Sequence, residues 1–133
     1  MGRWAMRDVG GPALEAARTA AWHHLLAPAL ASVGEAPGAG SVAAIREAVA
    51  LFGRIGWPGE PLEPPRTLDE TDAALVRRAG LACLGCGDSL ARDLSALPPS
   101  VDGGEQAGQA ARELHRGRLI LAAVGEMAAR DGR

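Results

Sequence analysis

Apolar residues recur every three or four positions along four stretches of this chain, which is the spacing of one face of an α-helix. The second stretch shows it most simply, with Val42, Ile45, Val49 and Phe52 in one stripe. Clusters of Gly and Pro separate the stretches and mark loops. The pattern predicts helices over residues 12–31, 41–54, 67–97 and 102–130, and no stretch alternates in the manner of a strand.

Capping residues and proline set the predicted helix boundaries. Pro28 has no backbone N–H to donate, so the first helix is expected to kink or stop just before it. Ser41 is a favoured N-cap for the second helix. Thr67 and Glu70 fit a capping box at the start of the third helix, and Asp102 repeats this pattern for the fourth.

The third predicted helix contains Gly80, Gly85 and Gly87, each of which weakens a helix by about 1 kcal/mol relative to Ala. The apolar stripe nevertheless keeps one phase from Leu68 to Leu97, so one long helix is predicted. The fourth helix is expected to present one apolar face, made of Ala107, Ala111, Leu114, Leu121, Val124 and Ala128.

The segment over residues 57–66, WPGEPLEPPR, holds four prolines in ten residues. Such a segment favours an extended conformation, and it predicts a stiff crossover between the second and third helices. The chain is therefore expected to form an all-α, four-helix bundle-like single domain over residues 1–133. With 28 Ala, 18 Gly and one Phe, the helices should pack closely through small side chains.

Charge and composition narrow the possible partners. The chain balances 14 Arg against 16 acidic residues, for a net charge of −2, and no block of like charge occurs. A nucleic-acid surface needs a basic patch and a membrane-surface helix needs a basic face, so we expect neither partner. The absence of Lys, Asn and Tyr is typical of a GC-rich bacterial genome, such as that of an actinobacterium.

No signal peptide is recognisable at the N-terminus, and the longest apolar stretch, residues 119–124, is too short to span a membrane. We therefore expect a cytoplasmic protein, in which the two cysteines stay reduced.

Cys83-Leu84-Gly85-Cys86 is the pattern that points most directly to chemistry. Residues three apart on a helix share a face, so the two sulfurs could approach each other. A redox pair needs one stabilised thiolate, whereas both cysteines lie on the predicted apolar stripe. The simpler interpretation is two small buried hydrophobic residues, and we expect their thiols to react slowly.

The run from Cys83 to Ser89, CLGCGDS, resembles the C-x-x-C-x-D-S run of the all-helical alkylhydroperoxidase D and carboxymuconolactone decarboxylase group. The resemblance implies a thiol-dependent redox enzyme that uses Cys83 and Cys86. In that family a His follows the second Cys by four positions, and a Glu lies upstream. Here Leu90 occupies the His position and Glu70 is out of register, so the family's proton relay has no counterpart at these positions.

Residues 75–119 also look like small helical proteins encoded near actinobacterial biosynthetic gene clusters. The shared arrangement is a helix, a Leu-Pro-Pro turn and a second helix that carries several Arg. This likeness implies an accessory role in a natural-product pathway.

Histidines, arginines and one tryptophan are the remaining candidate ligand-binding residues. A structural zinc site needs four ligands at recognisable spacing, and one C-x-x-C supplies half of them, so no metal and no other cofactor is expected. Trp57 is expected to pin the crossover to the bundle. Arg112, Arg116 and Arg118 could line an anion site with Arg side chains of the third helix. The candidates for a polar pocket between the helices are His23, His24, Trp57, Arg77, Arg78 and His115.

Three functions stay open at this point. The lack of a catalytic motif favours a small non-catalytic interaction or accessory protein that has a regulatory role or serves a bacterial natural-product pathway. It would bind itself, a protein partner or a small ligand. The first alternative is the thiol-dependent redox enzyme. The second is a small pathway enzyme or ligand-binding protein with a pocket lined by His and Arg. Because a core of Leu and Ala leaves apolar helix faces to cover, we expect a homodimer.

Overall fold

The structure is a computed structural model, and it describes residues 4–5, 10–35, 38–61 and 67–131. It confirms the all-α fold. One continuous rod consists of α1 (Gly10–Ala21), the π-helix η2 (Trp22–Leu26) and α2 (Ala27–Glu35). The other helices are α3 (Ala39–Ile55), α4 (Glu70–Ser95) and α5 (Gly104–Asp131). Two short strands, β1 (Trp4–Ala5) and β2 (Thr67–Leu68), pair antiparallel.

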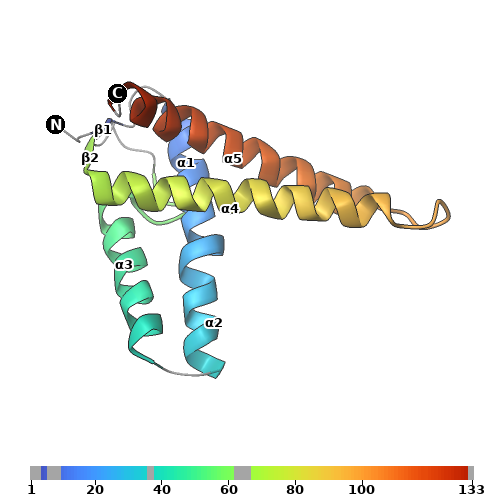
Figure 1. The fold of residues 1–133 in the computed structure, drawn as a ribbon, viewed down its shortest axis with the longest axis horizontal. Coiled ribbons are helices and arrows are strands. Elements are labelled where there is room, and N and C mark those ends of the chain that lie inside the picture. Colours follow the sequence, from blue (N-terminus) through green and yellow to red (C-terminus); the bar gives the residue numbers. More distant parts are fainter. Residues whose placement is uncertain (1–3, 6–9, 36–37, 62–66, 132–133) are drawn as a thin grey trace.

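The helices form two antiparallel pairs that cross each other (Figure 1). The long helices α4 and α5 run side by side along most of their length. The rod crosses this pair, so that α1 packs on both α4 and α5, and α2 then projects away with α3 beside it. The packing is therefore bundle-like near α1, whereas α2 and α3 form an arm. Among the described residues, no helix is long and apolar enough to cross a membrane.

The sequence predicted that the first helix kinks or stops just before Pro28; the structure shows no stop there, and the rod continues to Glu35. The turn before it is instead a π-helix, in which the backbone N–H of Ala27 donates to the carbonyl oxygen of Trp22. A proline lacks the N–H for the usual helical bond and crowds the carbonyl one turn earlier. The wider π turn accommodates this defect without ending the helix.

Two predicted caps are wrong. Asp69 is the N-cap of α4, because its carboxylate accepts the backbone N–H of Asp72 at 2.8 Å. Thr67 instead lies in β2, paired with Ala5. Because Thr67 takes part in this strand pairing, it does not serve as the N-cap that the capping box requires. Ser41 lies inside α3, whose N-cap is Gly38, without a side-chain cap.

The cap predicted for the fourth helix is displaced by one residue. The carboxylate of Asp102 accepts the backbone N–H of Gly104, the first residue of α5, at 3.0 Å.

The long helix α4 is continuous through its glycines, as predicted. Two of these glycines allow α5 to approach closely. A Cβ at Gly80 would lie 2.7 Å from Ile120 Cγ2, and one at Gly87 would lie 2.7 Å from Leu114 Cγ. Across the interface, a Cβ at Gly117 would lie 2.9 Å from the carbonyl oxygen of Gly80. The backbones of α4 and α5 therefore meet where side chains are absent.

A buried arginine ties the rod to the end of α3. Arg18 is fully buried, and its Nε donates to the carbonyl oxygen of Ile55 at 2.6 Å. Its Nη1 donates to the carbonyl oxygen of Glu60 at 3.0 Å. Nothing in the helical periodicity distinguished Arg18 from a surface arginine, because its partners are carbonyl groups far away in the sequence.

The first part of the crossover packs on the arm through aromatic rings. Trp57 stacks on Phe52 with ring centroids 4.4 Å apart, and Trp22 meets both rings edge-on. The rest of the predicted crossover, residues 62–66, lies outside the described residues.

The observed cap predicts a specific stability effect. Asp69→Ala should lower the free energy of unfolding by about 1 kcal/mol, because the N–H of Asp72 loses its acceptor. Asp69→Asn should retain most of the stability, since Asn is an equally good N-cap. Chemical denaturation followed by circular dichroism measures both. Equal losses in the two variants would contradict the capping role.

The close contact of α4 and α5 predicts opposite effects for two glycines. Gly117→Ala and Gly85→Ala gain the same helix propensity, but a Cβ at Gly85 meets nothing within 4 Å. Gly117→Ala should therefore be less stable than Gly85→Ala by about 1–3 kcal/mol, which is the usual cost of overpacking. Denaturant unfolding of the two variants measures the difference, and equal stability would show that the helices can separate at no cost.

Candidate functional site

The two cysteines lie on the inner face of α4. Cys83 is fully buried and belongs to the apolar core, whereas Cys86 is half-buried. They share a face because they are one helical turn apart. Cys83 therefore lies where the sequence placed it, among core residues, but Cys86 lies at the margin of the core.

A carboxylate from α5 reaches both thiols. The Glu113 side chain is only 10 % exposed. The Cys86 thiol donates to Glu113 Oε2, with sulfur and oxygen 3.8 Å apart. Cys83 Sγ lies within 4.8 Å of a Glu113 carboxylate oxygen, in a group that also includes His24. The thiol pair thus faces a buried carboxylate.

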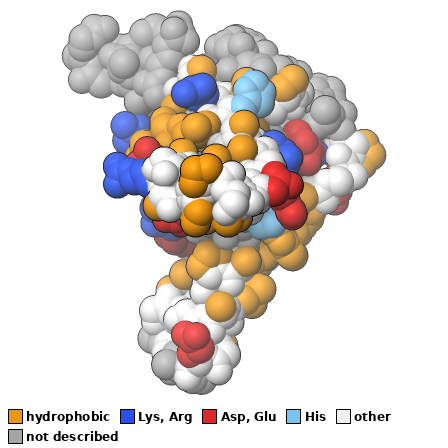
Figure 2. All heavy atoms as spheres, turned by 90° about the vertical axis from the view of Figure 1, so that its right-hand side faces the viewer, with side chains coloured by type: hydrophobic (Ala, Val, Ile, Leu, Met, Phe, Trp, Pro, Cys, Tyr) orange, Lys and Arg blue, Asp and Glu red, His pale blue; other side chains and the backbone are white. Residues whose placement is uncertain are grey.

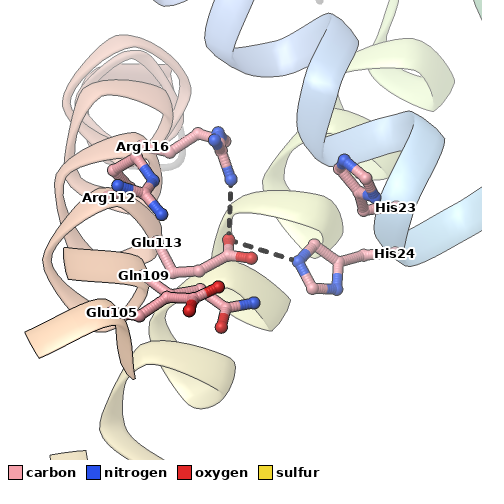
Figure 3. A pocket seen from close by; sticks show the side chains of 7 residues that line it. All are labelled: His23, His24, Glu105, Gln109, Arg112, Glu113 and Arg116. Carbon is pink, nitrogen blue, oxygen red and sulfur yellow. Dashed lines mark hydrogen bonds and ion pairs between the residues drawn. The ribbon is translucent and has the colours of Figure 1, made fainter. Parts of the chain in front are cut away.

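Two further side chains hold Glu113 in place (Figure 3). Arg116 Nη1 donates to Glu113 Oε1 at 2.9 Å from one turn along α5. His24 Nε2 lies 3.5 Å from the same oxygen. His24 belongs to the π-helix η2, and such wide turns occur often at functional sites because they re-aim side chains. Three elements therefore converge on one carboxylate.

The carboxylate stays ionised while the thiols stay protonated. Burial by itself raises the pKa of Glu113, but the Cys83 hydrogen bond, the Arg116 charge and the His24 contact outweigh it, and this pKa is lowered. Burial, followed by the nearby Glu113 carboxylate, raises the pKa of Cys83 to about 12. The same two causes, in the same order, raise the pKa of Cys86. Glu113 is thus a hydrogen-bond acceptor beside two thiol donors.

An open cavity of about 470 Å³ adjoins this cluster. Figure 3 shows its side chains, which come from η2 and from one face of α5. Glu113 and His24 belong both to the cavity and to the thiol cluster, whereas neither cysteine lines the cavity. The lining residues are His23, His24, Glu105, Gln109, Arg112, Glu113 and Arg116.

The structure brings together only some of the predicted candidates. Cys83, Cys86 and His24 meet in one cluster, and His23 lies beside it in the cavity wall. Trp57 belongs to the aromatic cluster on the arm. Arg77 and Arg78 are exposed on α4, where Arg78 lies 3.8 Å from Glu47 of α3.

The other arginine and histidine candidates lie on α5. His115 is exposed and lines a separate, shallower groove together with Arg112 and Arg116. Arg118 is exposed and lines neither of these two hollows. The anion site proposed between arginines of the two long helices is therefore not formed by Arg77 or Arg78.

Glu113 was missed because the predicted apolar face of the fourth helix was only partly right. Val124 is buried as predicted, and Leu114 and Leu121 are half-buried. The buried positions among the described residues of α5 are Ala110, Glu113, Gly117, Ile120, Ala123 and Val124. The expected face used Ala107 and Ala111 instead, which are exposed. Neither a charged residue nor glycine counts as apolar in a periodicity argument. The sequence does contain a signal for a buried Glu113. This glutamate lies in heptad register with Ala110, Gly117 and Ile120, and Arg116 follows it three residues later.

Comparison of the chain with protein-family models, with curated proteins and with solved structures gave no match. The likeness to the alkylhydroperoxidase D group therefore rests on the seven residues from Cys83 to Ser89.

The raised pKa of Cys83 predicts how this thiol reacts with a water-soluble alkylating reagent. Because only the thiolate is nucleophilic, the rate in the folded Cys86→Ala variant should increase about tenfold per pH unit up to about pH 10. In denaturant the rate should instead level off near the ordinary pKa of a thiol. Time-resolved alkylation measured by mass spectrometry tests this. A plateau below pH 8 in the folded protein would show a stabilised thiolate and contradict the prediction.

Proposed function

We propose that this protein is a thiol-dependent oxidoreductase that reduces a small hydroperoxide and forms a disulfide between Cys83 and Cys86. The observation that carries the proposal is the ionised carboxylate of Glu113, buried in contact with the C-x-x-C thiols. It supplies the proton acceptor that the positions flanking the C-x-x-C lack. The interpretation of the cysteines as inert core residues explains Cys83 but gives Glu113 no role.

A buried carboxylate is costly unless partners compensate for it. Here Arg116 and His24 provide this compensation, and both are themselves largely shielded from solvent. Helix packing alone would be served equally well by an apolar residue at position 113. Because both Arg116 and His24 contact the one carboxylate of Glu113, we infer that Glu113 has a chemical role.

The proposed reaction starts at Cys86, which is the more accessible sulfur. Glu113 Oε2 accepts the Cys86 proton as the sulfur attacks one oxygen of the hydroperoxide. The O–O bond breaks, the alcohol leaves with a proton, and Cys86 becomes a sulfenic acid. Cys83 then attacks this sulfur, and water leaves. Two thiols and one hydroperoxide thus give one disulfide, one alcohol and one water, and an external dithiol restores the thiols.

The burial of the thiols favours a small oxidant. Cys83 is fully buried, and neither sulfur lines the open cavity. A protein disulfide would need an exposed sulfur for in-line attack, whereas a hydroperoxide needs only a narrow approach to Cys86. Hydroperoxide reduction is therefore favoured over exchange with a protein disulfide.

The cluster supports the family resemblance in an altered form. The relay residues expected near the C-x-x-C are replaced by Glu113 from α5 and His24 from η2. Leu90, at the position where the family has its His, accepts a hydrogen bond only through its backbone carbonyl, from Gln106. The acid–base groups would thus come from different helices than in that group.

The cavity favours a second candidate, a small pathway enzyme or ligand-binding protein. Its volume of about 470 Å³ and its lining of His, Arg, Glu and Gln suit a small polar molecule. The non-catalytic interaction protein, its accessory role in a bacterial pathway and its cytoplasmic location stay predictions.

The proposed homodimer would use the arm. Leu30, Val42 and Val49 are exposed there, and Figure 2 shows mainly hydrophobic and uncharged groups along the arm from that side. An apolar surface of this kind supports self-association.

The redox proposal predicts a strong dependence on Glu113. At pH 7, hydrogen peroxide should oxidise the reduced protein to an intramolecular disulfide, and Glu113→Gln should slow this step about 100-fold, the usual contribution of a general base. The variant's rate should then rise with pH, because the thiol must ionise without a base. It should level off at a lower pH than the thiol of the parent protein would, because the Glu113 charge that raises the pKa of Cys86 is gone. Stopped-flow oxidation with mass spectrometry of the alkylated products measures both.

Glu105→Gln is the matched control. Glu105 lies on the same helix and lines the same cavity, but no described contact joins it to a thiol. This variant should react like the parent protein. Oxidation that is equally fast in all three proteins, or that stops at separate sulfenic acids, would overturn the proposed function.

A further inference from the structure

Three different donor atoms lie close together in the thiol cluster. They are a ring nitrogen of His24, the Cys83 sulfur and a carboxylate oxygen of Glu113, all within 4.8 Å of one another. Each comes from a different helical element, η2, α4 and α5. Within the described residues, this is the group whose spacing and chemistry suit a metal ion.

We propose that the reduced protein binds one zinc ion through His24, Cys83, Glu113 and Cys86. Imidazole nitrogen, thiolate sulfur and carboxylate oxygen are the donors that zinc takes in proteins. With bonds of about 2.0–2.3 Å, a tetrahedral zinc places its ligand atoms roughly 3.3–3.8 Å apart. The observed spacing therefore needs only a small contraction.

Cys86 is the candidate for the fourth ligand. Its sulfur lies 3.8 Å from Glu113 Oε2, but it lies outside the group of donor atoms that are within 4.8 Å of one another, so its side chain would move toward them when the ion binds. The sequence had shown only half of a zinc site, because a C-x-x-C with scattered histidines has no recognisable ligand spacing. The fold supplies the other half from helices that are distant along the chain.

The surroundings suit a bound dication. Two thiolates and the Glu113 carboxylate carry three negative charges, and zinc together with Arg116 carries three positive charges. The site would therefore be neutral overall, as a mostly buried site requires. Arg116 donates to Glu113 Oε1 at 2.9 Å, which orients the carboxylate. Such contacts behind a ligand are typical of metal sites.

This inference uses the same residues as the proposed redox function but does not depend on it. Zinc and the disulfide exclude each other, because both need the two sulfurs. A bound zinc would hold the thiols in a reduced state, and oxidation would release the ion. Metal binding is therefore tested on reduced protein without oxidant, and peroxide oxidation on protein treated with a chelator, so that either property can fail alone.

The test is a titration of the reduced, chelator-treated protein with Co²⁺ and then Zn²⁺ under anaerobic conditions. One Co²⁺ per chain should give the visible bands of tetrahedral cobalt and a sulfur-to-cobalt charge-transfer band, and Zn²⁺ should displace it. Cys86→Ser should roughly halve the charge-transfer band, because one of two thiolates is lost.

His24→Ala and His23→Ala form a matched pair for this titration. Both residues lie in η2 and line the cavity, but only His24 belongs to the donor group. His24→Ala should weaken zinc binding about 100-fold or more, and His23→Ala should leave it unchanged. Circular dichroism checks that both variants are folded. Failure of Co²⁺ to bind tetrahedrally, or equal effects of the two histidine variants, would overturn the zinc site.

Discussion

The close approach of α4 and α5 is the constraint on which the rest of the structure depends. Gly80 and Gly117 let the two backbones meet, and Gly87 receives Leu114 one turn below Cys83. Larger residues at these positions would hold the helices apart. Because the helices are close, the short side chain of Glu113 spans the gap to the thiols. The small-residue composition of the chain thus serves the geometry of the site directly.

The carboxylate of Glu113 organises the electrostatics of the site. It accepts hydrogen bonds from thiols, pairs with Arg116 and contacts His24, so that one buried charge is shared among several partners. The proposed proton transfer from Cys86 and the proposed coordination of a dication both rest on this arrangement. Both proposals therefore follow from a single physical requirement, that a charge removed from water must be compensated on every side.

The crossing rod brings the third component of the site. Its π turn at Trp22–Leu26 accommodates Pro28 and aims His24 at Glu113. Arg18, one turn before this segment, is bound to the carbonyl groups of Ile55 and Glu60. These bonds anchor the rod to the end of α3 and so hold the histidine at a defined distance from the long helices.

Local features of the sequence by themselves determined the class of this fold. Apolar periodicity located the helices, including the continuous α4, because a helix is formed by contacts between residues three and four apart. The tertiary structure decided the rest. Asp69 replaced Thr67 as a cap because β2 pairs with a distant strand, and Glu113 lies in the core because α5 packs on α4 through a glycine-lined contact that apolar periodicity did not identify. Cys83 and Cys86 were visible as a motif, but Glu113 and His24, which lie beside them, belong to other helical elements. Only long-range packing brings such groups together, and no local spacing in the sequence records it.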